Sequence, residues 1–177
     1  MEILSALLSG CFLMRPNKFQ DQRGSFIKTY HHNTYSVLGI DLTMEEEFYS
    51  LSNKNVIRGM HFQQPPHAHN KLVYCPHGAA LDVLLDLRRG TTYGQVAVTE
   101  LTADNGHILY IPKGVAHGFL SLEDQTLMVY KTSTAHAPQS DMGIHWASFG
   151  FNWSVTEPIL SARDQEHVSF SDYQSSF

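Results

Sequence analysis

The feature that most constrains the fold is a succession of short apolar runs separated by turn-forming residues. β-branched and aromatic residues dominate these runs, and long segments with helical periodicity are few. Short apolar runs that recur at this spacing are typical of an all-β sandwich or barrel. Only residues 33–38 and the segment 158–177 suggest short helices. The predicted strands cover residues 11–14, 25–30, 48–52, 56–63, 71–75, 79–87, 95–101, 107–111, 118–122, 127–132 and 145–153.

Bulk properties favour one domain spanning residues 1–177, without nucleic-acid or membrane partners. The chain has 177 residues, and its net charge of -5 argues against a nucleic-acid surface, which is usually basic. Cys11 and Cys75 are too few for a disulfide framework. The apolar run 1–8 lacks a basic flank and is too short to cross a bilayer. We therefore expect a cytoplasmic protein.

The run 56–63 carries a histidine beside a glycine, a place where a ligand can approach a strand closely. Strict alternation puts His61 and Gly59 on one face and Arg58 on the other. A β-bulge at Gly59 would bring Arg58 and His61 to the same face. His61 alone fits either a functional residue or a hydrogen-bonded core histidine.

A hairpin is expected where residues 71–75 and 79–86 flank Pro76-His77-Gly78. A turn centred on Pro76-His77 would set Lys71 opposite Asp82 on one face. A buried charge must be paired, so this pairing would mark Lys71 as a candidate functional residue.

The run 106–117 has the spacing Gly-x5-Pro-x-Gly-x2-His. It predicts a strand, a tight turn in which Gly114 takes positive φ, and His117 at the start of the next strand. This pattern resembles the second motif of the cupin superfamily, whose members are small β-barrels of the jelly-roll type.

Taken together, the motifs resemble the dTDP-4-dehydrorhamnose 3,5-epimerase family of nucleotide-sugar epimerases. The resemblance implies an all-β jelly-roll and a cofactor-independent isomerase. Such an enzyme acts at C3 and/or C5 of a nucleoside-diphosphate-4-keto-6-deoxyhexose in deoxysugar biosynthesis. It also implies a homodimer with exchanged N-terminal strands, to which residues 1–15 would contribute. The matching pieces are DQRGSF (21–26), VIRGMHFQ (56–63), KLV (71–73), DVLLDLR (82–88), YG (93–94), IPKGVAHGF (111–119), YKT (130–132), GIHW (143–146) and PILSARD (158–164).

The resemblance also implies catalytic roles, which fit the chemistry of proton transfer next to a ketone. His61 matches the base, and its imidazole suits that task near neutral pH. Asp164 matches the carboxylate that orients it. Lys71 matches the cation facing the C4 oxygen, where negative charge develops. Tyr130 matches the acid on the other ring face, and Asp82 is expected to keep Lys71 charged.

A second set of residues is expected to bind substrate. Arginines pair with phosphate bidentately, so Arg23, Arg58 and Arg163 are candidates for the diphosphate. Instead of binding substrate, Arg58 could form a structural ion pair. His117 could contact the sugar or hydrogen-bond the backbone after the Pro-x-Gly turn. The full predicted set is Arg23, Phe26, Lys28, Glu46, Phe48, Arg58, Gln63, His117, His136 and Arg163.

Four of these positions depart from the family pattern: Lys28, Glu46, Phe48 and His136. In the family they lie at or near the thymine pocket. One interpretation is neutral sequence drift, in which Lys28 and Glu46 form a compensating salt bridge. The other is a different nucleobase, because a carboxylate accepts from the amine of cytosine. A dTDP-sugar is the expected substrate, with CDP-, GDP- or UDP-sugars as alternatives.

Three competing functions remain open at this point. One keeps the substrate class but changes the reaction to a 3,4-ketoisomerase. Another is a metal-binding cupin that uses His67, His69 and His117, although no metal is our main expectation. The third is a sugar-nucleotide binding module without catalysis.

Overall fold

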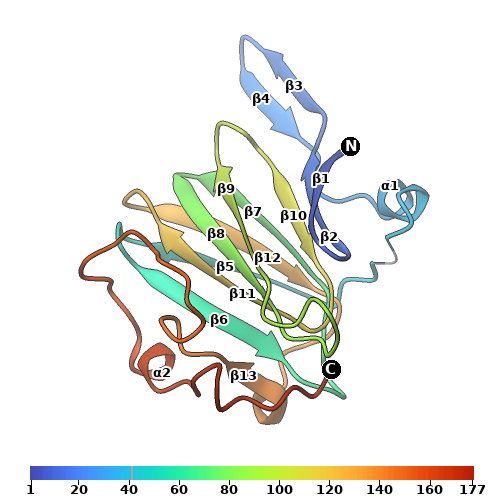
Figure 1. Cartoon of the computed structure of the whole chain (residues 1–177). Coiled ribbons are helices and arrows are strands. Elements are labelled where there is room, and N and C mark those ends of the chain that lie inside the picture. The colour runs from blue at the N-terminus through green and yellow to red at the C-terminus, as the bar shows by residue number, and fades with distance from the viewer. Residues whose placement is uncertain (41) are drawn as a thin grey trace.

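The computed structural model describes residues 1–40 and 42–177, which form two antiparallel sheets packed face to face (Figure 1). The six-stranded sheet has the order β1-β2-β10-β7-β12-β5, and the five-stranded sheet has the order β13-β6-β11-β8-β9. The two-sheet architecture confirms the predicted all-β jelly-roll class. The first sheet contains β1 (Glu2–Leu8), β2 (Cys11–Arg15), β5 (Glu46–Ser52), β7 (Lys71–His77), β10 (Ile108–Ile111) and β12 (Thr126–Thr132). The second contains β6 (Ile57–Gln63), β8 (Ala79–Asp86), β9 (Val96–Thr102), β11 (Val115–Ser121) and β13 (Asp141–Gly143).

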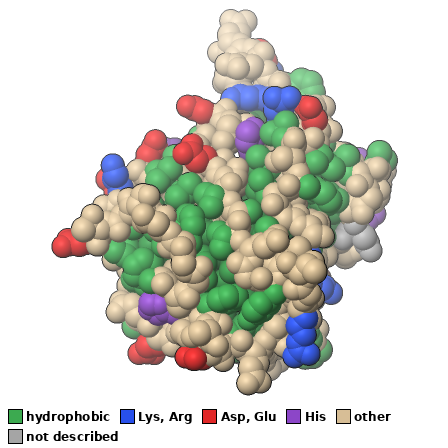
Figure 2. Space-filling model, in the orientation of Figure 1, with side chains coloured by type: hydrophobic (Ala, Val, Ile, Leu, Met, Phe, Trp, Pro, Cys, Tyr) green, Lys and Arg blue, Asp and Glu red, His purple; other side chains and the backbone are tan. Residues whose placement is uncertain are grey.

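The remaining elements are short and peripheral. A separate hairpin, β3 (Lys18–Asp21) and β4 (Gly24–Ile27), stands out from the body of the molecule at the top of Figures 1 and 2. The helices are α1 (His32–Val37), the 3-10 helix η1 (Pro138–Ser140) and α2 (Ala162–Gln165). No helix in the described part of the chain is long and apolar enough to cross a bilayer.

Burial on both faces explains why the central strands read as continuous apolar runs. Between the sheets, Val73, Leu84 and Met128 are completely buried. On the outer face of the five-stranded sheet, Met60 and Val83 pack in a second cluster with the aromatic C-terminal segment. The sheet that carries His61 is therefore held rigidly from both sides.

The expected strand at residues 145–153 is wrong, because this segment forms turns and irregular structure. Its aromatic side chains pack in the cluster outside the five-stranded sheet, and Phe151 and Trp153 meet edge to face at 5.1 Å. An apolar run that covers a sheet resembles a strand in composition, which explains the error.

The predicted hairpin between residues 71–75 and 79–86 is also wrong. β7 pairs with β10 and β12, whereas β8 pairs with β9 and β11. The chain passes from one sheet to the other at Gly78, which has φ of +78° and where a Cβ would lie 2.9 Å from the Cα of Thr126. Lys71 and Asp82 therefore belong to facing sheets rather than neighbouring strands.

The bulge considered at Gly59 is present. His117 pairs with His61 and Phe119 pairs with Arg58, so Gly118 alone opposes Gly59 and Met60. A Cβ on Gly59 would lie 2.6 Å from the Cα of Gly118, and φ is +152°, so only glycine fits. As a result, Arg58 and His61 both face the same pocket.

Candidate active site

A pocket of about 350 Å³ lies between the two sheets. Each sheet contributes polar side chains to an otherwise apolar interior, a combination that is typical of a ligand site. Most of the predicted site residues line it: Glu46, Phe48, Arg58, His61, Gln63, Lys71, His117, Tyr130, His136 and Arg163.

His61, on β6, is hydrogen-bonded to a carboxylate behind it. Its Nε2 lies 2.6 Å from Oδ1 of Asp164, and the two side chains are 31% and 5% exposed. Ser161 caps the short helix α2 by accepting from the backbone N–H of Asp164, which fixes the carboxylate. Burial lowers the pKa of His61 although Asp164 opposes the shift, so the imidazole is neutral near pH 7.

Sequence reasoning missed His167, a second imidazole on the same carboxylate. Its Nε2 lies 3.4 Å from Oδ1 of Asp164, and its ring meets that of His61 edge to face at 5.6 Å. Burial alone would raise the pKa of Asp164, but the polar side chains of His167, His61 and Ser161 around the carboxylate bring it well below the usual range. The spacing of three residues between Asp164, in the short helix α2, and His167, just after it, was the available signal.

Lys71, on β7, reaches across the interior from the facing sheet. Its side chain is buried, and Nζ donates to the backbone carbonyl of His61 at 3.2 Å. Burial lowers the pKa of Lys71 to about 8, while the charges of Asp141 and Asp82 raise it. The ammonium is therefore still mostly protonated at pH 7. Asp141 is a further residue that the sequence did not reveal.

Tyr130, on β12, lies on the sheet that faces His61. Its ring stacks on Phe48 with centroids 4.9 Å apart, and its hydroxyl lies 3.3 Å from Oγ of Ser50. Burial raises the pKa of Tyr130, so the phenol keeps its proton at neutral pH. A neutral imidazole and a protonated phenol thus occupy facing walls of one pocket.

Asp82 has a different partner from the one expected. Its Oδ2 lies 2.7 Å from Nε2 of His117, and both side chains are almost inaccessible to solvent. Burial raises the pKa of Asp82, although His117 and Lys71 both favour its charged form. Asp82 therefore acts on Lys71 through its charge rather than by cross-strand pairing.

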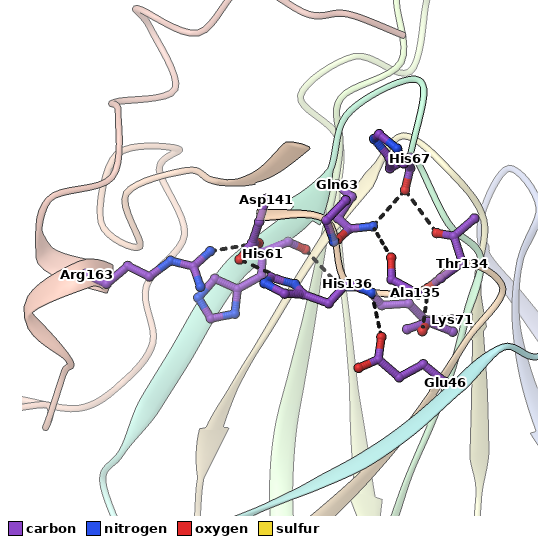
Figure 3. A network of polar contacts seen from close by, with 12 residues as sticks. Glu46, His61, Gln63, His67, Lys71, Thr134, Ala135, His136, Asp141 and Arg163 are labelled. Carbon is purple, nitrogen blue, oxygen red and sulfur yellow. Dashed lines mark hydrogen bonds and ion pairs between the residues drawn. The ribbon is translucent and has the colours of Figure 1, made fainter. Parts of the chain in front are cut away.

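Two arginines supply positive charge to the pocket. Nη2 of Arg163 lies 2.8 Å from Oδ1 of Asp141 (Figure 3), and Nε of Arg58 donates to Oγ of Ser52 at 3.0 Å. Arg58 is thus oriented by a hydroxyl, and no carboxylate in the described chain pairs with it. Both guanidinium groups line the pocket and are suited to bind an anion.

Comparison with known proteins places this arrangement in a family. The family model described as dTDP-4-dehydrorhamnose 3,5-epimerase matches residues 5–172. The chain belongs to this family. The Escherichia coli (strain K12) dTDP-4-dehydrorhamnose 3,5-epimerase is 37% identical over 170 residues, covering 93% of this chain and 92% of that protein.

Two further members of the epimerase family are similar to this chain. The crystal structure of the Bacillus anthracis dTDP-4-dehydrorhamnose 3,5-epimerase, with TDP and PPi bound, has a TM-score of 0.92 and 34% identity. The match covers 95% of this chain and 98% of that one. A Streptomyces niveus dTDP-4-dehydrorhamnose 3-epimerase is 32% identical over 169 residues, covering 93% of this chain and 82% of that protein.

Three of the four positions that we expected to depart from the epimerase family pattern lie at the pocket: Glu46, Phe48 and His136. Oε2 of Glu46 accepts from the backbone N–H of His136 at 2.6 Å, which ties β5 to the loop 133–137 (Figure 3). Gln63 fixes the same loop, because its Nε2 donates to the carbonyl of Ala135 at 3.3 Å and its Oε1 accepts from the N–H of Ala137 at 2.7 Å. The same Nε2 also donates to the carbonyl of His67 at 2.8 Å. These contacts shape the rim of the pocket.

The fourth departure, Lys28, lies with Arg23 and Phe26 on or just after the projecting hairpin, outside the pocket of its own chain. Arg23 pairs with Asp21, and Phe26 is 61% exposed. Lys28 lines a separate hollow, and in the described chain no salt bridge joins it to Glu46. The structure therefore does not bring these three predicted site residues to the pocket formed by the two sheets.

The three histidines of the metal-cupin alternative do not converge. His117 is engaged with Asp82, and Nδ1 of His67 lies 2.9 Å from Oγ of Ser140. His69 lines the pocket with both ring nitrogens buried and without hydrogen-bond partners, and burial lowers its pKa to about 3. Within residues 1–40 and 42–177, the one group of three potential metal ligands is His61, Asp164 and His167.

Proposed function

We propose that this protein epimerises a nucleoside-diphosphate-4-keto-6-deoxyhexose at C3 and/or C5 in deoxysugar biosynthesis. The observation that carries the proposal is the placement of His61, backed by Asp164, on one wall and Tyr130 on the facing wall, with Lys71 reaching between them. Membership of the dTDP-4-dehydrorhamnose 3,5-epimerase family supports it. A dTDP-sugar is the expected substrate.

His61 acts as the base in this proposal. Its Nε2–H donates to Asp164, which leaves the lone pair of Nδ1 to take a proton from the sugar carbon next to the ketone. The electron pair of the broken C–H bond moves toward the C4 oxygen and forms an enolate. The imidazolium that results is stabilised by the ionised Asp164.

Lys71 stabilises the enolate oxygen, and Tyr130 returns a proton. An ammonium buried in a pocket interacts more strongly with developing negative charge than it would in water. Tyr130 gives its hydroxyl proton to carbon from the other ring face, which inverts the centre. Its phenolate then regains a proton from solvent or from the His61 imidazolium.

We assign the diphosphate to Arg58 and Arg163, and the nucleoside to the neighbourhood of Glu46, Phe48 and His136. Phe48 offers an exposed ring face, being 46% exposed, against which a planar base can stack. One oxygen of Glu46 is engaged by the backbone of His136, and the other is available to an amine. Isothermal titration with dTDP, CDP, UDP and GDP tests the base. Clear preference for dTDP would rule out recognition of an amine by Glu46.

We further propose a cytoplasmic homodimer in which the N-terminal region reaches the partner. Exposed Phe19 and Phe26 pair on the projecting hairpin with ring centroids 6.4 Å apart, and an apolar surface of this kind is suited to burial. Arg23, Phe26 and Lys28 would then contact the other protomer's pocket. Light scattering tests the state, and a Phe19→Ser, Phe26→Ser variant should shift it toward monomer.

Proton NMR in deuterated water tests the reaction itself. With dTDP-4-keto-6-deoxyglucose we expect solvent deuterium at C3, C5 or both, and the position of the label shows which centres the enzyme inverts. His61→Asn should abolish this exchange. A product with its carbonyl group at C3 instead of C4 would indicate a 3,4-ketoisomerase. Tight nucleotide binding without deuterium exchange would indicate a binding module.

A further inference from the structure

His61, Asp164 and His167 together form a set of donors that the proposed reaction does not use in full. The reaction needs one imidazole and one carboxylate, yet a second imidazole lies against the same oxygen. One ligand atom from each of the three side chains lies within 4.8 Å of the other two, and the Nε2 atoms of His61 and His167 lie 2.6 and 3.4 Å from Oδ1 of Asp164. Two imidazoles and a carboxylate are a common ligand set for divalent transition metals.

We propose that these three side chains form a binding site for a divalent transition-metal ion such as Zn²⁺, and that its occupation blocks the base. Zinc with nitrogen and oxygen ligands at about 2.1 Å and tetrahedral angles separates ligand atoms by about 3.4 Å. The Nε2 of His167 already lies 3.4 Å from Oδ1 of Asp164. The Nε2 of His61, at 2.6 Å from that oxygen, needs to move back by under about 1 Å to admit the ion.

His167 is held in place for this purpose by its surroundings. A Cβ on Gly143 would overlap the His167 ring, so the glycine makes room for the imidazole. The neighbouring Val168 pairs with Ile144 and accepts from the N–H of His145, which fixes this segment against β13. The Nε2 of His167 is buried and has no partner that meets hydrogen-bond geometry. A bound ion would give this nitrogen the partner it lacks.

The electrostatics permit a cation at this position. Asp164 contributes a carboxylate to the site, and the charge of Arg163 is matched by Asp141 at 2.8 Å. Lys71 is directed at the backbone carbonyl of His61, and Arg58 is held by Oγ of Ser52. Both imidazoles bind the ion in their neutral form, with the ring proton on Nδ1 and the lone pair on Nε2. His61 then has no lone pair left for substrate.

Titration of Zn²⁺ into the purified protein, followed by calorimetry, tests the site. We expect one equivalent to bind in the micromolar range, and His167→Gln, which keeps the approximate volume, to weaken binding at least about 10-fold. The matched control is His67→Ala, which removes one half of His67-Ala68-His69 and should leave binding unchanged. No binding, equal affinity of wild type and His167→Gln, or loss of binding in His67→Ala would each overturn the proposal.

Two further measurements separate this inference from the proposed function. Co²⁺ in place of Zn²⁺ should give visible absorption bands that His167→Gln loses, whatever reaction the protein catalyses. The blocking effect rests on the proposed function: Zn²⁺ should slow deuterium exchange in wild type far more than in His167→Gln. If no variant exchanges deuterium but the cobalt bands depend on His167, the epimerase proposal fails and the metal site stands.

Discussion

The protein contains two histidine–carboxylate pairs on neighbouring strands that resemble each other in geometry and differ in environment. His61 and His117 are direct cross-strand partners on β6 and β11. Their Nε2 atoms lie 2.6 and 2.7 Å from oxygens of Asp164 and Asp82, respectively. Yet His61 is 31% exposed, whereas His117 is 4% exposed and its carboxylate is completely buried.

This difference shows that the surroundings of each carboxylate determine which chemical role its histidine pair is suited to. Asp164 receives several donors, its pKa falls, and it can stabilise a charge that forms on His61. Asp82 is enclosed, its pKa rises, and its second oxygen has no hydrogen-bond partner. The pair of His61 is thus suited to proton transfer, and the pair of His117 to supporting Lys71.

The largest expected effect comes from replacing each histidine with glutamine, whose amide can keep the hydrogen bond to the carboxylate. His61→Gln should lower kcat/KM for the proposed epimerisation by about 10⁴-fold, since it removes the general base. His117→Gln should lower it by about 10-fold or less. Deuterium exchange at the sugar carbons measures both.

The comparison would fail if His117→Gln, with unchanged thermal unfolding, lost exchange to the same degree as His61→Gln. His32→Gln, on the exposed helix α1, is the control for a substitution away from the pocket. It should leave exchange unchanged.

Lys71→Met should lower kcat by about 10³-fold while it stabilises the fold. The rate falls because the substitution removes the ammonium that is assigned to the enolate oxygen. The pKa of Lys71 drops from 10.5 to about 8 on folding, so its burial costs about 3 kcal/mol at pH 7. A methionine of similar shape removes this cost, and we expect a gain of about 2 kcal/mol in the free energy of unfolding after loss of the Nζ bond.

The sign of the pH dependence follows from the direction of that shift. Between pH 8 and 10.5 the unfolded state binds more protons at Lys71 than the folded state does. Wild-type stability should therefore gain a rising contribution from this residue across that window, which Lys71→Met should lack. Urea unfolding at pH 7 and pH 10 measures it, and identical pH dependence of the two proteins would contradict the assignment.

Asp164→Asn should lower kcat/KM by about 100-fold with little change in substrate affinity. The amide can present its N–H to His61 and stabilise the wrong tautomer, and it cannot stabilise the imidazolium. Asp164→Glu is the conservative comparison and should recover part of the rate. A variant that raised KM alone would show that Asp164 holds substrate rather than His61.

Much of the fold and of the pocket could be predicted from the sequence, because both depend on local patterns. The spacing of the short apolar runs indicated the all-β class. The glycine in Arg58-Gly59-Met60-His61 indicated the bulge that the structure contains. The hairpin failed for a physical reason. A turn sequence such as Pro76-His77-Gly78 shows that the chain reverses, but it does not show whether the next strand returns to the same sheet.

The contacts that the sequence could not reveal are those between distant segments. Asp141 meets Arg163, and the Asp164–His167 turn meets His61, only because the C-terminal segment folds back over the five-stranded sheet. The projecting hairpin is a further case. Residues that seemed to belong to one site, Arg23 among them, lie away from it in this chain, because a motif specifies residues and not where the fold places them.

The smallest and most selective effect is expected for Asp82→Asn. Lys71 at a pKa of about 8 predicts that kcat/KM falls above pH 8, as the ammonium loses its proton. On the acid side, activity should persist below the ordinary histidine pKa, since burial lowers that of His61. Removing the Asp82 charge takes away one of the two carboxylates that keep Lys71 protonated, so the alkaline limb should move to lower pH by under about one unit. The acid limb, set by the pair of His61, should stay in place. A shift of the acid limb in Asp82→Asn would show that the two pairs are coupled and do not act as separate base and support.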